Sequence, residues 1–436
     1  MIPRPDICDS PAWSFPLPQV SELSTGVTIW TYDLPGQYIL ACNLVLELPL
    51  NSEPDNHHGV STIAVRCLDE GTHTHPGSQY ALALEDIGAT FHGHIGLSTV
   101  QCLLDLPDTG LATGLELLAE AVTSPAYDEN DVLRIKANRL FEIEQQESRG
   151  SYVASTALKQ ALFDRNLRMS QPVGGSHDQV CSLTAADVAS YQARHYGSQG
   201  ATLIIAGDLR GVDALGAARS AFGGWNPVTT PIAAERPAPG DMTSHLIHRD
   251  GAVQADVRMG WFGIDRHDPR WASLQVAVAI MGGSFNSRLN TVLREEKGYT
   301  YGVSMGVHPF REAGYISVST STRTSAVADL VGDALDILKA RKDFTENEIH
   351  DAIGYLTLSA PLSLNTAEAV AGQGATIAAA RLDLDYVTTS LSALSRVTAS
   401  TAMDAYRELI DSDNPALIVV GDCDEITGLG ITPDPH

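Results

Sequence analysis

Two segments of the chain carry the same pattern at a fixed separation, and this repetition constrains the fold more than any other feature. Thr184 opens a predicted helix, and the apolar run ATLIIAGD follows it at 201–208. Thr398 opens a second predicted helix, and PALIVVGD follows it at 415–422. The two threonines are 214 residues apart, and so are the glycines near the ends of the two runs. A helix–strand unit that recurs at one offset indicates a tandem duplication, with chance similarity as the alternative.

A proline-rich stretch lies between the two copies. The segment PVTTPIAAERPAPG (227–240) contains four prolines, which exclude a regular helix or a central strand. We therefore divide the chain into an N-terminal domain at 1–226, a linker at 227–243 and a C-terminal domain at 244–436.

Each half alternates predicted strands and helices in an irregular order. Strands are expected at 26–34, 38–48, 97–106, 255–264 and 313–322, and helices at 81–88, 110–122, 271–283 and 324–341. Short turns between the strands favour antiparallel pairing, and no glycine-rich nucleotide-binding fingerprint follows a strand. The prediction is an α+β fold of two duplicated domains, each a mostly antiparallel sheet packed with helices.

The charge balance excludes one class of partner. The chain has 53 acidic and 28 basic side chains and a net charge of −25, which repels the phosphate backbone of nucleic acid. A basic or neutral peptide suits this surface better, although the charge could serve solubility alone. The six cysteines form no C-x-x-C pair, and no signal peptide or membrane-spanning stretch is apparent. We expect a cytoplasmic, soluble protein with no membrane partner.

The segment GGSFNSRLNTVLREEKGYTYGVSMG (282–306) carries the most chemical information. Its apolar residues recur on one face of a predicted helix, and Gly298 is expected to end that helix. Arg294 then lies near the helix end and Tyr301 on the following strand, so that a sharp turn can bring the two together. A guanidinium and a phenol can bind a peptide backbone and stabilise an oxyanion. Chemistry alone also allows an ordinary solvated arginine and a half-buried tyrosine.

This segment resembles the substrate-binding motif of the insulinase/pitrilysin-like metallopeptidases, the inverzincins. The family pattern is Gly-Gly, Ser-Arg-Leu, then Leu-Arg-Glu-x-x-Gly-x-x-Tyr, and residues 282–301 follow it closely. Residues 183–208 and 253–283 resemble further units of the family in the same order, so the resemblance covers nearly the whole chain. It implies that Arg294 and Tyr301 contact the peptide backbone beside the cleaved bond.

The zinc motif of that family is missing. The family binds zinc with H-x-x-E-H on a helix and a later Glu, but no H-x-x-E-H occurs in this chain. The resemblance places Thr62, Val65 and Arg66 at the motif positions, Glu142 at the third ligand and Ile135 at a supporting Glu. Because one carboxylate cannot hold zinc, we expect no metal in this chain, a remnant role for Glu142 and an ion pair between Glu142 and Arg66.

Histidines offer a separate possibility for a metal site. His92 and His94 share one face of a predicted strand, and His73 and His75 flank a predicted turn; His57 and His58 add to the local count. A His-x-His pair on a strand can bind a metal, although surface histidines are commoner.

Several members of the resembled family are split into two chains, one with H-x-x-E-H and one with the Arg/Tyr pair. This chain is similar to the second kind. The resemblance implies a non-metal-binding subunit that binds peptide and completes a two-chain zinc peptidase, with zinc and H-x-x-E-H in a homologous partner. In isolation it could form a homodimer. The alternatives are an inactive scaffold or peptide-holding protein, and a homodimeric hydrolase that uses His73, His75, His92 and His94.

Overall fold

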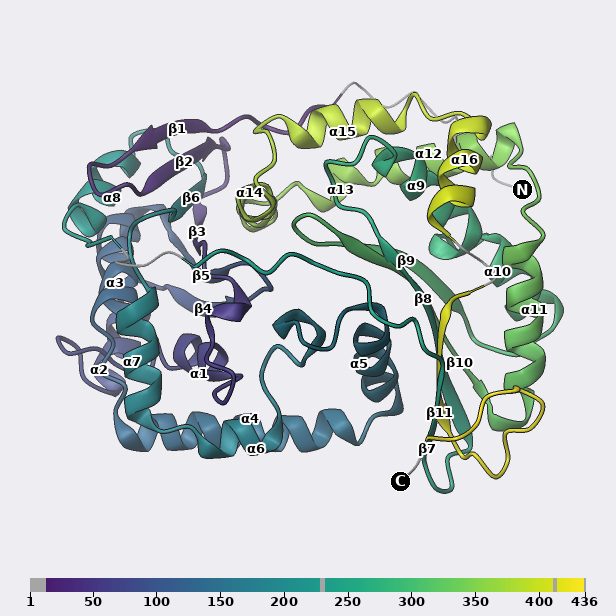
Figure 1. The fold of residues 1–436 in the computed structure, drawn as a ribbon. Helices are drawn as coiled ribbons and strands as arrows, with labels where there is room; N and C mark the ends of the chain where they lie inside the picture. Colours follow the sequence, from purple (N-terminus) through teal and green to yellow (C-terminus); the bar gives the residue numbers. More distant parts are fainter. Residues whose placement is uncertain (1–12, 228–231, 411–413, 435–436) are drawn as a thin grey trace, which may run out of the picture.

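The computed structural model describes residues 13–227, 232–410 and 414–434. Cys8, the first residues of the predicted N-terminal domain and residues 228–231 of the predicted linker lie outside the described residues. The first half of the chain lies on the left of Figure 1 and the second half on the right, each with its own sheet and helices. The predicted α+β class is therefore confirmed.

The first sheet has six strands in the order β1-β2-β6-β3-β5-β4. Its strands are β1 (Gln19–Glu22), β2 (Thr28–Asp33), β3 (Ile39–Leu46), β4 (Thr90–Ile95), β5 (Val100–Pro107) and β6 (Thr202–Gly207). Neighbouring strands are antiparallel except β2 and β6, which run parallel.

The second sheet repeats this arrangement in the order β7-β11-β8-β10-β9. Its strands are β7 (His245–His248), β8 (Gln254–Gly263), β9 (Val303–Pro309), β10 (Gly314–Arg323) and β11 (Ala416–Gly421). The parallel pair, β7 with β11, takes the place of β2 with β6. The matching strand order confirms the duplication, and among the described strands only β1 has no counterpart.

Each half of the chain also contributes its own set of helices. The first half contains α1 (Val60–Arg66), α2 (Ser78–Asp86), α3 (Leu111–Thr123), α4 (Glu129–Glu147), α5 (Gly150–Leu162), α6 (His177–Ser182), α7 (Ala185–His195) and α8 (Ala214–Phe222). The second half contains α9 (Trp271–Val278), η4 (Ala279–Gly283), α10 (Arg288–Asn290), η5 (Thr291–Glu296), α11 (Val327–Lys339), α12 (Glu346–Leu358), α13 (Ala360–Ser363), α14 (Ala367–Ala380), α15 (Tyr386–Leu394) and α16 (Ala399–Leu409). Short 3-10 turns are η1 (Leu50–Ser52), η2 (Asp108–Gly110), η3 (Arg168–Ser170) and η6 (Thr324–Ala326).

The two threonines at the repeat offset cap equivalent helices. Thr184 accepts a hydrogen bond from the backbone of Asp187 and begins α7, while Thr398 accepts one from Thr401 and begins α16. In both cases the residue three positions on bonds back to the threonine, which closes a capping box. The predicted helix starts are therefore confirmed.

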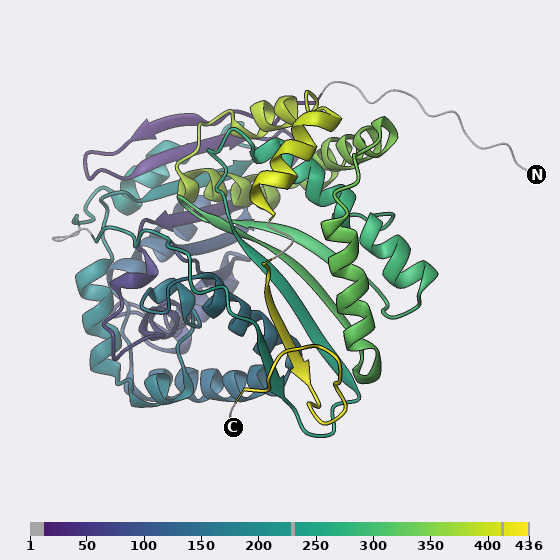
Figure 2. The same ribbon diagram turned by 45° about the vertical axis from the view of Figure 1, so that its right-hand side comes forward.

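The two halves exchange one helix each. Helix α14, from the second half, covers a face of the first sheet, where Ala371 and Ile377 pack with Tyr32 and Ile204. Helix α5, from the first half, packs against β8 and β11 of the second sheet (Figure 1, Figure 2). Because both faces of each sheet are covered in this way, β3 and β11 consist almost entirely of buried residues.

The described part of the proline-rich linker runs against the first half. It contains no helix or strand, as its prolines predict, apart from a bridge between Pro239 and Phe163. The Glu235 carboxylate accepts hydrogen bonds from the backbone of Arg168 at 2.9 Å and of Met169 at 3.3 Å. Among the helices of the described residues, none combines the length and apolar character that crossing a membrane requires.

Candidate functional site

Helix α1 carries the three positions that correspond to the zinc motif, and a buried carboxylate binds its first residues. The Glu53 carboxylate accepts hydrogen bonds from the backbone of Gly59 and Ser61, both at 3.0 Å. Arg168 binds the same carboxylate at 2.7 Å, and both side chains are almost fully buried. These contacts supply an acceptor for the free N–H groups at the start of α1 and fix its position beside β4.

The expected ion pair between Arg66 and Glu142 is formed. Arg66 Nη1 donates to the two carboxylate oxygens of Glu142 at 2.8 and 2.9 Å, and Arg139 Nη1 donates to the same carboxylate at 3.2 Å. Burial alone would raise the pKa of Glu142, but the hydrogen bonds and charges of the two arginines outweigh it and lower that pKa. Glu142 is thus a carboxylate shared by two cations.

These residues do not fit a zinc ion. Zinc needs three or four nitrogen, sulfur or oxygen donors, and here a methyl-bearing Val65 and a permanently charged Arg66 stand beside a carboxylate that is already bound to guanidinium groups. Thr62 offers only a hydroxyl. In the part of the chain that the structure describes, no group of three or more His, Cys, Asp or Glu could hold a metal ion.

The four histidines singled out in the sequence do not gather into a ligand set. His75 Nδ1 lies 3.0 Å from both carboxylate oxygens of Glu120, which connects the turn to α3. His94 is among the residues that line the cavity beside α1 and His92 is not, and β4 presents Gly93, not His94, to Val65 of α1.

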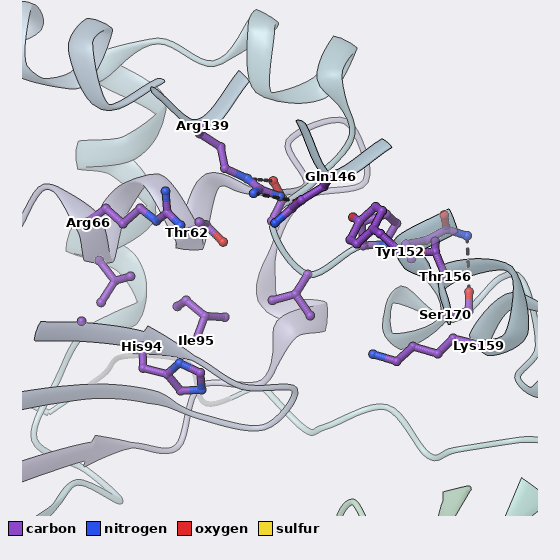
Figure 3. Close-up of a pocket in the computed structure, with 16 residues that line it drawn as sticks. Thr62, Arg66, His94, Ile95, Arg139, Gln146, Tyr152, Thr156, Lys159 and Ser170 are labelled. Atoms are coloured by element: carbon purple, nitrogen blue, oxygen red, sulfur yellow. Dashed lines mark hydrogen bonds between the residues drawn. The ribbon is translucent and has the colours of Figure 1, made fainter. Parts of the chain in front are cut away.

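A cavity of about 330 Å³ opens at the positions where the resemblance places the zinc. Thr62, Val65 and Arg66 line it from α1, and Figure 3 shows Thr62 and Arg66 at the cavity wall. Arg139 on α4 and Lys159 on α5 also line it, and the sequence analysis missed both. Neither residue belongs to a sequence motif. Lys159 reaches the cavity because α5 packs against the second sheet and not the first.

Arg294 and Tyr301 lie on either side of a turn, with one difference from the prediction. Arg294 is in η5, and Gly298 has a φ of +64°, which suits its expected place at the helix end. The predicted strand begins only at Val303, so Tyr301 precedes β9 instead of lying in it. The hydrogen bond from Val303 to the Asn290 side chain, at 2.9 Å, marks where regular strand pairing takes over.

The two side chains are differently held. The Arg294 guanidinium stacks over the Phe285 ring at 4.3 Å from the ring centre and lies 3.5 Å from the Glu295 carboxylate. Tyr301 is 95% exposed, and Phe285 is 68% exposed. Within the described residues, Arg294 and Tyr301 share no hydrogen bond or ring contact. The Tyr301 side chain is open to the surface, and the Arg294 side chain is 30% exposed beside Glu295.

Comparison with known families identifies the fold. A model described as Insulinase (Peptidase family M16) matches residues 41–173, and one described as Peptidase M16 inactive domain matches residues 182–356. The two matches follow each other along the chain and include both α1 and the Arg294–Tyr301 segment. The chain belongs to the peptidase M16 (insulinase) family.

The relatives of this chain include proteins described as zinc proteases and one described as a non-peptidase homolog. It is 24% identical over 352 residues to an uncharacterised zinc protease of Streptomyces coelicolor, covering 79% of this chain and 76% of the relative. It is 25% identical over 318 residues to the non-peptidase homolog YmxG of Helicobacter pylori, covering 71% and 72%.

Solved structures share the fold. A peptidase M16 inactive domain from Pseudomonas fluorescens superposes with a TM-score of 0.85 at 22% identity, covering 96% of this chain and 99% of that one. A chain of complex III2 from Candida albicans gives 0.77 at 15% identity, covering 92% and 95%. At these identities the likeness concerns the fold alone.

Proposed function

We propose that this chain is the non-metal-binding subunit of a two-chain zinc peptidase. Arg294 and Tyr301 bind the peptide substrate, and a homologous partner with H-x-x-E-H supplies the metal. The partner's zinc would polarise the scissile carbonyl and activate water. The two domains of this chain would face those of the partner and enclose the substrate between them.

The observation that carries the proposal is the free exposure of Tyr301, together with the partly exposed Arg294, in a chain where an ion pair occupies the expected zinc position. Tyr301 has no intramolecular partner among the described residues and is 95% exposed, so it contributes little to stability, whereas its hydroxyl can donate to a substrate oxygen. Stacking on Phe285 limits the motion of the Arg294 plane and leaves edge N–H donors available to carbonyl groups.

The chemical contribution of this chain would be positioning and charge stabilisation. Arg294 would orient the peptide backbone, and Tyr301 would donate a hydrogen bond to the oxygen that gains charge as the carbonyl is attacked. A donor of this kind acts mainly in the transition state, so its loss lowers kcat more than it raises KM.

The test is to mix the purified chain with a homologous H-x-x-E-H chain and to measure cleavage of a quenched fluorescent peptide. Activity should need both chains, and Tyr301→Phe or Arg294→Ala should lower kcat/KM by about 100-fold. Tyr38→Phe and Arg323→Ala, at exposed positions outside the proposed site, are matched controls that should keep full activity. Unchanged activity in the Tyr301 and Arg294 variants would remove the proposed role.

The alternative is a scaffold or peptide-holding protein. The non-peptidase homolog among the relatives and the complex III2 chain of the same fold favour keeping this candidate. It predicts that the mixture binds peptide or assembles without cleaving, and that Tyr301→Phe leaves assembly unchanged. Size measurement of the isolated chain would show whether it also forms the homodimer considered above.

A further inference from the structure

The cavity beside α1 has a basic lining in a strongly acidic chain. The chain carries 53 acidic and 28 basic side chains, yet Arg66, Arg139 and Lys159 line the cavity and no aspartate or glutamate does. The three cations come from α1, α4 and α5, so their convergence depends on tertiary structure. Basic side chains that converge on a cavity create a local positive potential, which attracts an anion.

The charges around this cavity are not balanced. Glu142 is the carboxylate that binds Arg66 and Arg139, so one negative charge serves two guanidinium groups. The Lys159 side chain has no hydrogen bond or ion pair in the described part of the chain, and burial lowers its pKa. Burial, and after it the charge of Lys159, lowers the pKa of His308 on β9.

A second polar group on the cavity wall lacks a partner. Thr62 is only 8% exposed, and its hydroxyl oxygen has no hydrogen-bond partner among the described residues. That oxygen has almost no accessible surface and does not open onto the cavity, whereas in Figure 3 the ammonium end of Lys159 extends into the cavity from α5. Polar groups inside a protein are normally paired, so an ammonium without a partner that extends into a cavity indicates room for an anionic ligand.

The remaining lining residues and the volume of the cavity indicate what kind of ligand fits. Val65, Ile95 and Val173 provide apolar surface next to the basic groups. The volume of about 330 Å³ exceeds what a lone oxyanion fills. A ligand that has both a carboxylate and an aliphatic side chain matches the two kinds of wall together.

We propose that this cavity binds the free C-terminal carboxylate of a peptide. Lys159 contacts the carboxylate, Arg66 and Arg139 add positive charge from the other side of the cavity, and the last side chain packs on Val65 and Ile95. The position that holds zinc in the family resemblance is thereby an anion site in this chain. This inference does not depend on the proposed function, because the site is distinct from Arg294 and Tyr301 and can be measured without a partner.

The test uses the full chain and a fluorescein-labelled Ala-Ala-Leu peptide in two forms, with a free C-terminus and with a C-terminal amide. Fluorescence anisotropy should show about tenfold weaker binding of the amide, because charge-assisted hydrogen bonds are lost. Lys159→Gln should weaken binding of the free acid by a similar factor and leave binding of the amide unchanged.

Controls separate the site from general effects of charge and folding. Lys342→Gln removes an exposed lysine far along the chain and should bind like the unaltered protein. Thermal unfolding should show that Lys159→Gln is folded. Equal binding of acid and amide, or of Lys159→Gln and the unaltered protein, would overturn the proposal.

Inorganic phosphate is tested as a competitor of the labelled peptide. Weak competition is expected. Displacement of the peptide at phosphate concentrations below the peptide Kd would assign the site to an inorganic oxyanion and contradict the proposed peptide ligand.

Discussion

Two ion pairs of the first half differ in how far their side chains are exposed to water. The side chains of Arg168 and Glu53 are 3% and 0% exposed, and Glu53 also accepts two backbone hydrogen bonds at the start of α1. The side chains of Arg66 and Glu142 are 37% and 40% exposed. Water screens the second pair, so the two pairs should contribute unequally to stability even though both have short contacts.

Replacing one arginine from each pair with methionine tests this difference. Arg168→Met leaves the Glu53 charge buried and should lower the free energy of unfolding by about 3–5 kcal/mol. Arg66→Met should lower it by about 1 kcal/mol or less, because Glu142 stays partly hydrated and keeps Arg139. Urea unfolding of both variants measures the two values, and equal losses would contradict the assignment of the buried pair.

At the level of elements, an ion pair fastens α10 to the start of α12. Arg288 binds the Glu348 carboxylate at 2.7 Å and donates to the carbonyl of Asp343 at 2.8 Å. Thr345 caps α12 and bonds the same carboxylate at 2.9 Å. The hydrogen bond from Arg288, followed by those from Thr345, lowers the pKa of Glu348 to about 2 against the opposing effect of burial. This contact positions the segment that leads into η5 and Arg294.

The stability of this connection should depend on pH in a defined window. A carboxylate with a lowered folded-state pKa stabilises the fold fully above its unfolded pKa of 4.5 and loses that effect as the pH falls toward 2. The full effect corresponds to about 3 kcal/mol. Arg288→Met should flatten the fall in unfolding free energy between pH 5 and pH 2, measured by denaturant titration at each pH. Arg407→Met, which breaks an exposed pair with Asp343, is the control and should keep the original slope.

At the scale of the whole molecule, the exchange of α5 and α14 joins the two halves into one structure. Leu158 of α5 is 2% exposed and packs beneath Gly260 of β8, where a larger residue would not fit. Val370 and Ala375 of α14 are equally buried on the first sheet. Each half therefore leaves an apolar sheet face uncovered without the other, which favours cooperative unfolding.

Leu158→Ala tests this coupling from within the first half. The cavity it leaves should lower the free energy of unfolding of the entire chain by about 2–5 kcal/mol, with one transition seen by all probes. Leu82→Ala, at a position that is 55% exposed, should change it little. If fluorescence and circular dichroism of the Leu158 variant report two separate transitions, the halves are independent and the coupling is wrong.

Local patterns were sufficient for much of the fold. The capping threonines, the apolar strand runs and the proline-rich break act through neighbouring residues, so helix starts, strand positions and the duplication could be read from the chain. The end of η5 at Gly298 was also accessible, because a positive φ favours glycine. The strand assignment of Tyr301 was wrong because β9 begins where pairing with β10 starts, and alternation of residue types does not mark that point.

The sequence by itself determined which groups this protein has at the two candidate positions: Arg294 and Tyr301 at one, and Thr62, Val65 and Arg66 at the other. Tertiary structure alone decided what surrounds them. Lys159 reaches the cavity because α5 crosses to the second sheet, and Tyr301 is free because no element packs over it. Such contacts join residues far apart in the chain, and their geometry depends on the packing of whole sheets and helices, which no local pattern encodes.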